Sequence, residues 1–225
     1  MSIRHPAFIA LVAALPTPAL AESDFQQWLG LAVRIDLTDT LSLQNESQAR
    51  WSGDRDGLYQ FQHSALLAYR AAPNVTVAAG YLHSPNYNGG KFASMERRAR
   101  EQVTVDNIVK LGPAALSARL RTEQRWRDDL SGTAWRVRPY VRLSLPLGEK
   151  ADPTLHLSEE VFVNLNTTAF QTVQGIERLR TMASLAFPIS KTVRLDAGYL
   201  NQHRIISGEE DRGEHALTAS LSFSF

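Results

Sequence analysis

Apolar and polar residues alternate along most of this chain. In its last eleven residues, HALTASLSFSF, every second residue from Leu217 to Phe225 is apolar, and the residues between them are small or polar. Successive side chains of a β-strand point to opposite faces, so a two-residue period predicts strands with one apolar and one polar face. No comparable 3.6-residue period follows residue 21. We therefore predict an all-β protein.

We count eleven strands, and the connections between them alternate in length. The alternation includes residues 29–37, 59–70, 75–81, 103–111, 116–127, 135–145, 155–165, 178–187, 193–199 and 215–225. Tight connections lie at residues 38–40, 72–74, 112–113 and 189–191, an intermediate one at 146–153, and longer polar ones at 52–57, 83–94, 128–133, 166–174 and 207–213. Short turns at one end and longer loops at the other are typical of an antiparallel up-and-down transmembrane β-barrel.

The first residues resemble an export signal. Arg4 and His5 form a basic start, Ala7–Leu15 is an apolar run, and Ala19–Ala21 fits the small-x-small rule for cleavage. The run is too short to span a bilayer as a helix, which needs about 20 residues. Pro16 and Pro18 argue against a buried helix. We predict a signal peptide at residues 1–21, cleaved near Ala21, and one barrel domain at residues 22–225.

Alternation alone does not say which face of the barrel is inside. A soluble barrel of the lipocalin kind turns its apolar face inward, whereas a membrane barrel turns it outward. The export signal, strands of about 9 to 14 residues and aromatic residues near strand ends favour the membrane. These aromatic residues are Trp28, Trp51, Tyr69, Tyr81, Trp126, Trp135, Phe187 and Phe225. Five polar residues fall on the predicted lipid-facing side and oppose this interpretation: Asn45, Ser47, Asn107, Glu159 and Glu177.

The C-terminal strand carries a further signal. Leu221, Phe223 and Phe225 give it an apolar face that ends on an aromatic residue. Such an end resembles the insertion signal of bacterial outer-membrane barrels, which the outer-membrane assembly machinery recognises. We therefore expect that machinery to be a partner during insertion and the protein to lie in a bacterial outer membrane.

Several stretches are similar to one protein family. They are DFQQWLGLAVRIDLTDTLSL (24–43), ARLRTEQRW (118–126), WRVRPYVRLSLPLG (135–148), LHLSEEVFVNL (155–165), LDAGYLNQ (195–202) and the closing SLSFSF. Together they resemble the exported barrel family catalogued as domain of unknown function 2490, over nearly the whole chain after the signal. The resemblance implies an outer-membrane barrel and implies no established activity or catalytic residue.

The strand count conflicts with the usual parity of such barrels. Single-chain bacterial barrels normally have an even number of strands, so that the first and last strands pair antiparallel. Eleven strands would make these two parallel. We therefore predict about twelve strands, with the missing one within residues 83–98, unless the N-terminus behaves differently.

Charged residues share the polar faces of several strands. Lysine occurs only at residues 91, 110, 150 and 191, so most cationic side chains are arginine. We predict a charge network in the lumen, made of Arg119, Arg121, Glu123, Arg125, Arg127, Arg136, Arg138, Arg142, Glu160, Arg178, Arg180, Arg194 and Asp196. Three roles are open: arginine–carboxylate ladders that fill the lumen, a wet and narrow passage that favours anions, or a rim site for lipopolysaccharide phosphates.

An enzyme is the alternative class. His156, Ser158 and Glu160 share one face of a strand and supply the groups of nucleophilic catalysis. Outer-membrane lipid A deacylases use similar residues. However, same-face neighbours stand about 7 Å apart along a strand, too far for direct proton transfer. A soluble periplasmic lipid-binding barrel is the third possibility.

The composition argues against several other functional classes. The formal net charge of +1 argues against nucleic-acid binding. The chain has no cysteine and its six histidines are scattered without metal-ligand spacing, so we predict no metal site and no cofactor. The sequence thus predicts an outer-membrane barrel that contacts membrane lipid and lipopolysaccharide, with a structural role or a narrow solute passage.

Overall fold

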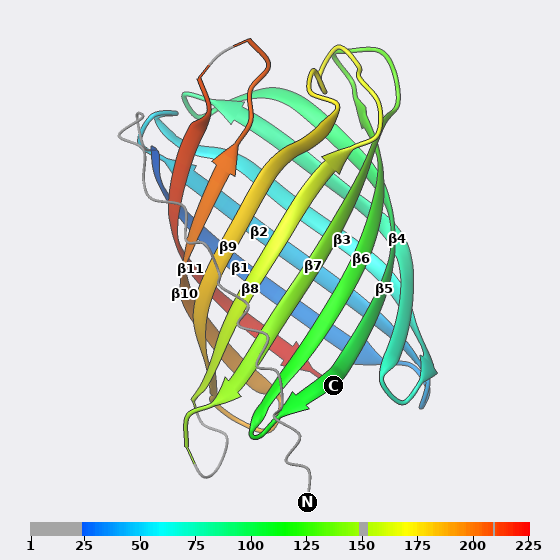
Figure 1. The fold of residues 1–225 in the computed structure, drawn as a ribbon. Coiled ribbons are helices and arrows are strands. Elements are labelled where there is room, and N and C mark those ends of the chain that lie inside the picture. Colours follow the sequence, from blue (N-terminus) through cyan, green and yellow to red (C-terminus); the bar gives the residue numbers. More distant parts are fainter. Residues whose placement is uncertain (1–23, 149–152, 209) are drawn as a thin grey trace, which may run out of the picture.

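The computed structural model describes residues 24–148, 153–208 and 210–225, and the predicted signal peptide lies outside this part of the chain. The described residues form eleven strands (Figure 1). They are β1 (Asp24–Asp36), β2 (Leu41–Ser52), β3 (Gly57–Ala72), β4 (Val75–Asn88), β5 (Lys91–Leu111), β6 (Ala114–Arg127), β7 (Ala134–Pro146), β8 (Thr154–Asn164), β9 (Gly175–Pro188), β10 (Val193–Arg204) and β11 (Arg212–Ser224). None of the described residues belongs to a helix long and apolar enough to cross a membrane.

The strands form one closed barrel in which each strand pairs with its sequence neighbour. These pairs are antiparallel, and β1 closes the barrel against β11 in parallel, from Asp24 opposite Glu214 to Arg34 opposite Ser224. Successive strands run in opposite directions, so an odd number makes the first and last strands parallel. The all-β barrel and the count of eleven strands are confirmed, and the expectation of twelve strands, which came from the usual parity, is wrong for the part of the chain described.

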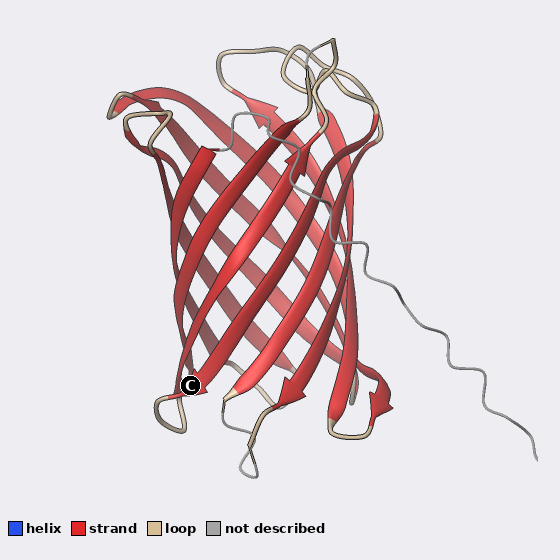
Figure 2. Cartoon of the chain, turned by 60° about the vertical axis from the view of Figure 1, so that its left-hand side comes forward, coloured by secondary structure: helices blue, strands red, loops and turns tan. Residues whose placement is uncertain are grey.

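Residues 83–98 hold no additional strand. They instead lengthen β4 and β5, which pair from Val75 opposite Val105 up to Asn88 opposite Lys91. Gly89 and Gly90 make the turn, and both have positive φ angles that glycine adopts without strain. The long loop predicted at residues 83–94 is therefore a strand hairpin. The other long connections lie at the same end of the barrel as this hairpin, and the short turns lie with the C-terminus at the opposite end (Figure 2).

The two faces of the barrel wall differ sharply in polarity. Large apolar side chains lie on the outer face, where Leu67, Leu120 and Val141 are 50%, 51% and 46% exposed. The side chains of Arg100 and Glu123 point into the lumen and are buried. A soluble ligand-binding barrel of the lipocalin kind has the reverse arrangement.

Two predicted orientations are wrong. Trp28 was expected at an outer rim, but its side chain is buried in the lumen against Leu200, Ala216 and Met182. Glu177 was expected on the outer face, but its carboxylate contacts lumen arginines. A register shift between β8 and β9 at Phe162 and Val163 accounts for the second case, because one extra residue reverses the facing of the next side chains. Asn45, Ser47 and Glu159 do pair with outward-facing neighbours, and Asn107 lies in an irregularity of β5.

Glycine lets the wall curve tightly at one lumen position. A Cβ atom on Gly80 of β4 would stand 2.0 Å from the carbonyl oxygen of Ala65 and 2.7 Å from the Cα of Leu66 on β3. Both atoms are backbone and cannot move aside cheaply. The close approach of these two strands therefore requires glycine at this position.

Candidate functional site: an arginine-rich lumen

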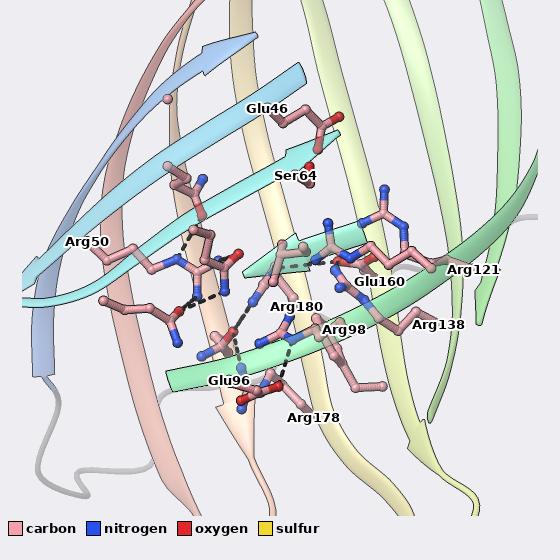
Figure 3. A pocket seen from close by; sticks show the side chains of 18 of the residues that line it. Glu46, Arg50, Ser64, Glu96, Arg98, Arg121, Arg138, Glu160, Arg178 and Arg180 are labelled. Carbon is pink, nitrogen blue, oxygen red and sulfur yellow. Dashed lines mark hydrogen bonds and ion pairs between the residues drawn. The ribbon is translucent and has the colours of Figure 1, made fainter. Parts of the chain in front are cut away.

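The lumen encloses a cavity of about 500 Å³ whose wall is dominated by arginine. Its charged lining comes from β2, from β5 to β11 and from the loop after β2. The lining holds twelve arginines, at positions 50, 55, 98, 100, 119, 121, 125, 136, 138, 178, 180 and 204, and four glutamates, at positions 46, 96, 160 and 214. Figure 3 shows ten of the lining side chains labelled, with arginine and glutamate converging from several strands.

Glu123 is the centre of the ion-pair network. It has no exposed surface, and its carboxylate lies beside the cavity wall. It accepts hydrogen bonds from Nε of Arg100 at 3.0 Å, from Nε and Nη2 of Arg136 at 3.0 and 2.6 Å, and from Nη1 of Arg138 at 2.9 Å. Nη1 of Arg98 stands 3.7 Å away. One buried carboxylate thus joins β5, β6 and β7.

Glu160 of β8 is a second centre. It accepts hydrogen bonds from Nη2 of Arg119 at 2.7 Å, Nη2 of Arg138 at 2.8 Å and Nη1 of Arg180 at 3.3 Å. Arg138 therefore bridges Glu160 and Glu123. These charge-assisted bonds connect strands that are not neighbours in the sheet, since Arg119 lies on β6 and Glu160 on β8.

Three further carboxylates are paired toward the loop end. Glu96 accepts two hydrogen bonds of 2.7 Å, one from Nε of Arg98 and one from Nε of Arg125. Glu177 accepts a hydrogen bond of 2.8 Å from Arg178. Glu214 accepts one of 3.3 Å from Arg204 and another from Gln202, and lies 3.6 Å from Arg55.

Guanidinium groups also pack against two buried aromatic rings. Four guanidinium carbons stand 4.3 to 5.1 Å from the ring centroid of Phe162, those of Arg136, Arg138, Arg178 and Arg180. Arg50 lies 3.9 Å and Arg180 4.9 Å from the Trp28 centroid. Such contacts stabilise guanidinium groups that are partly removed from water. Phe162 and Trp28 thus hold the arginine layer in place without neutralising it.

Several arginines have no carboxylate partner among the described residues. Arg50 donates only to the side-chain oxygens of three glutamines, Gln48, Gln60 and Gln62. Arg121 donates from Nε and Nη2 to Gln102 Oε1, at 2.9 and 2.7 Å. The Nε atoms of Arg119 and Arg138 are buried without a hydrogen-bond acceptor. The cavity therefore carries more positive charge than its own carboxylates offset.

The structure brings most of the predicted charge network together and separates a few members. Arg127 donates to Asp129 in the next loop, at 2.9 and 2.5 Å, and this hydrogen bond lowers the pKa of the exposed Asp129 carboxyl. Asp196 accepts a hydrogen bond of 2.7 Å from Ser184. Arg142 and Arg194 lie nearer the short-turn end, and neither forms an ion pair with Glu123 or Glu160.

The three residues weighed for catalysis are not joined. His156 Nδ1 is 2.9 Å from Ser144 Oγ, on β7. Ser158 lines a smaller cavity of about 180 Å³. The third residue, Glu160, is already bonded to three arginines. No hydrogen bond connects His156, Ser158 and Glu160 to one another within the described chain.

Sequence reasoning missed part of the site. Glu96, Arg98 and Arg100 alternate on the lumen face of β5, and Arg50 faces them from β2. Their spacing continues the alternation of residues 103–111 toward the N-terminus. The outward face of this stretch carries the charged residues Arg97 and Glu101 on either side of Ala99, so neither face has an apolar pattern there.

The predicted insertion signal lies on the closing strand. Leu221 and Phe223 face outward beside Leu31 and Val33 of β1, and the rings of Phe223 and Phe225 are stacked 6.4 Å apart. The backbone of Phe225 donates to the carbonyl of Arg34 at 3.0 Å and accepts from the amide of Asp36 at 2.9 Å. The last residue is therefore part of the barrel seam.

Comparison with known proteins gives a family without an assigned role. A model of the family described as "Protein of unknown function (DUF2490)" matches residues 25–212. An uncharacterized protein of Methylorubrum extorquens is 24% identical to this chain over 225 residues, which cover 97% of this chain and 98% of the relative. The family match spans most of the barrel, as the resemblance of the sequence predicted. The chain therefore belongs to the family of proteins of unknown function DUF2490.

Proposed function

We propose that this protein is an outer-membrane β-barrel whose lumen forms a narrow passage that favours anions. One observation carries the proposal: the closed barrel exposes apolar side chains outward and gathers excess arginine inside. Water-soluble proteins rarely expose such a continuous apolar surface, whereas a lipid-facing wall requires one. The lipid-binding alternative needs an apolar lumen and gains no support from this cavity.

The lumen charge supports the choice of ion. Twelve arginines and four glutamates line the cavity, and the buried Glu123 adds one more carboxylate beside it. A confined wall with excess positive charge attracts anions and repels cations, as charged rings do in pores. The many ion pairs across the lumen narrow the space, so we expect a small conductance.

Two measurements test the proposal. Outer-membrane barrels keep their fold in detergent until heated, so the unheated protein should migrate faster on a gel than the heated one. The folded protein in a planar bilayer with a KCl gradient should then give a reversal potential displaced toward that of chloride. A reversal potential displaced toward that of potassium would contradict the proposal.

A pair of variants makes the test specific. Arg50 lines the cavity and bonds only to neutral side chains, so Arg50→Gln removes a lumen charge without leaving a carboxylate unpaired. Arg97→Gln makes the same charge change on the outer face, opposite His83. We expect Arg50→Gln to lower the chloride-to-potassium permeability ratio and Arg97→Gln to leave it unchanged. Equal effects would mean that the lumen charge does not set the selectivity.

A structural barrel is the second candidate, and the glutamate centres favour it. Glu123 and Glu160 tie β5, β6, β7, β8 and β9 together across the interior. Such bonds can serve a barrel that conducts nothing. Folded protein that inserts into bilayers and passes no current would support this role over a passage.

A further inference from the structure

We propose that three lumen arginines, Arg100, Arg119 and Arg121, form a binding site for a phosphate-type oxyanion. We call this group the arginine chamber. The inference deepens the proposed function, since it rests on a lumen that admits anions, and it names the chemistry of the anion that is held there.

The three side chains share one region of the wall. Arg119 and Arg121 stand at alternate positions of β6, about 7 Å apart along one face. Arg121 pairs with Gln102 of β5, so Arg100 is its diagonal neighbour. Arg121 is within electrostatic reach of both other arginines and of Arg138. All three members of the chamber line the 500 Å³ cavity.

Their donors are incompletely used. Arg100 donates from Nε to Glu123, and its two Nη atoms have no hydrogen-bond partner among the described residues. Arg121 gives Nε and Nη2 to the neutral Gln102, which leaves Nη1 open. Arg119 gives Nη2 to Glu160, which leaves its Nη1 without a hydrogen-bond partner among the described residues. A guanidinium carries five N–H donors, so the chamber holds several that face no protein acceptor.

The nearby carboxylates cannot supply the missing acceptors. Glu123 and Glu160 each accept from three arginines already. Glu46 of β2 is the other acid within electrostatic reach of Arg100 and Arg121. It is exposed to the cavity and makes no hydrogen bond or ion pair with the described residues, and Figure 3 shows it apart from the dashed network.

Phosphate fits this arrangement better than other small anions. Chloride has one atom and cannot match separate planar forks, and a small carboxylate offers only two oxygens, which lie in one plane, and a single charge. A tetrahedral oxyanion has oxygens in several directions and can accept from three arginines at once. Its double negative charge also offsets more of the excess positive charge of the chamber.

The test measures phosphate binding to the folded protein in detergent by titration calorimetry, at constant ionic strength, with acetate and chloride for comparison. We expect phosphate to bind more tightly than either. Arg121→Gln should weaken phosphate binding by about ten- to hundredfold, because a hydrogen bond to a charged group is lost. Arg194→Gln removes an exposed lumen arginine that does not line this cavity, and it should bind phosphate as the unaltered protein does.

Glu46→Gln gives a second, independent readout. Glu46 is exposed and unpaired, so this variant keeps the fold, and loss of its negative charge should tighten phosphate binding. Equal affinity for phosphate and chloride, equal weakening by Arg121→Gln and Arg194→Gln, or no tightening by Glu46→Gln would each overturn the site. The chloride reversal potential is a separate measurement. An anion-selective protein without phosphate affinity therefore refutes the chamber alone, and a phosphate-binding protein that selects cations refutes the passage alone.

Discussion

The strongest test of the lumen network is the removal of its central carboxylate. Glu123→Gln keeps the size of the side chain but removes the charge that Arg100, Arg136 and Arg138 share. Four hydrogen bonds of 2.6 to 3.0 Å then lose a charged acceptor. The guanidinium groups stay in place, buried and mutually repelling.

The expected loss of stability follows from this geometry. Removing one partner of a buried ion pair typically costs about 3–5 kcal/mol, because the other charge stays buried without compensation. Glu123 has no exposed surface, so water cannot enter at this position and solvate the guanidinium groups unless the wall moves. We expect the free energy of unfolding to fall by about 3–5 kcal/mol, which shifts the urea midpoint by about 2 M for a denaturant slope of about 2 kcal/mol/M.

The assay is reversible urea unfolding in detergent or lipid, followed by tryptophan fluorescence. Glu46→Gln is the matched control, because it makes the same chemical change at an exposed lumen carboxylate without partners, and it should cost less than about 0.5 kcal/mol. If Glu123→Gln and Glu46→Gln unfold at the same urea concentration, the network does not hold the wall together.

A double variant separates the lost bonds from the unpaired charge. Arg100 has Glu123 as its carboxylate partner among the described residues, so Arg100→Gln in the Glu123→Gln background removes a charge that has lost this partner. We expect the double variant to lose less free energy of unfolding than the two single variants lose together, by about 1 kcal/mol or more. Simple additivity would show that the two side chains are not coupled.

Three further predictions follow. Gly80→Ala should strongly reduce the fraction of heat-modifiable, folded barrel, because its Cβ would overlap β3 backbone, whereas Gly213→Ala should fold normally because no atom lies within 4 Å of its Cβ; equal yields would contradict the close approach. Ser158→Ala should leave the acylation of lipid A unchanged in cells, since the described structure shows no hydrogen bond between Ser158 and His156. An altered acylation pattern would instead support the enzyme hypothesis. Phe225→Ser should lower the amount of folded protein in the outer membrane while its backbone bonds remain possible, and wild-type levels would exclude the insertion signal.

The local alternation of residues was enough to predict strands and most facings. Charged residues occupy every second position from Arg119 to Arg125, so Arg119, Arg121 and Glu123 had to share one face wherever the strand was placed. The same argument put Leu221 and Phe223 on the opposite, apolar face of the last strand. Facing within a strand depends only on neighbouring residues, and it is therefore readable without any tertiary contact.

The closure of the barrel by a parallel strand pair and the extent of β4 and β5 needed the folded chain. Pro85, the Gly89–Gly90 turn and the charges of Arg97 and Glu101 interrupt the apolar pattern of this hairpin, and only pairing with each other and with their neighbours keeps these residues in strands. The parallel seam between β1 and β11 is likewise a contact between the two ends of the chain.

The pairing of charged side chains in the lumen was also decided by the tertiary structure. The sequence predicted an inward set of arginines and glutamates, but not that Glu123 and Glu160 would take three arginines each and leave Arg50 and Arg121 with glutamine partners. Nor could it show the bulge that turns Glu177 inward, or the burial of Trp28 beneath two guanidinium groups. Facing is a property of successive residues, whereas pairing depends on the register between strands and on distances across the barrel, which exist only once the wall has closed.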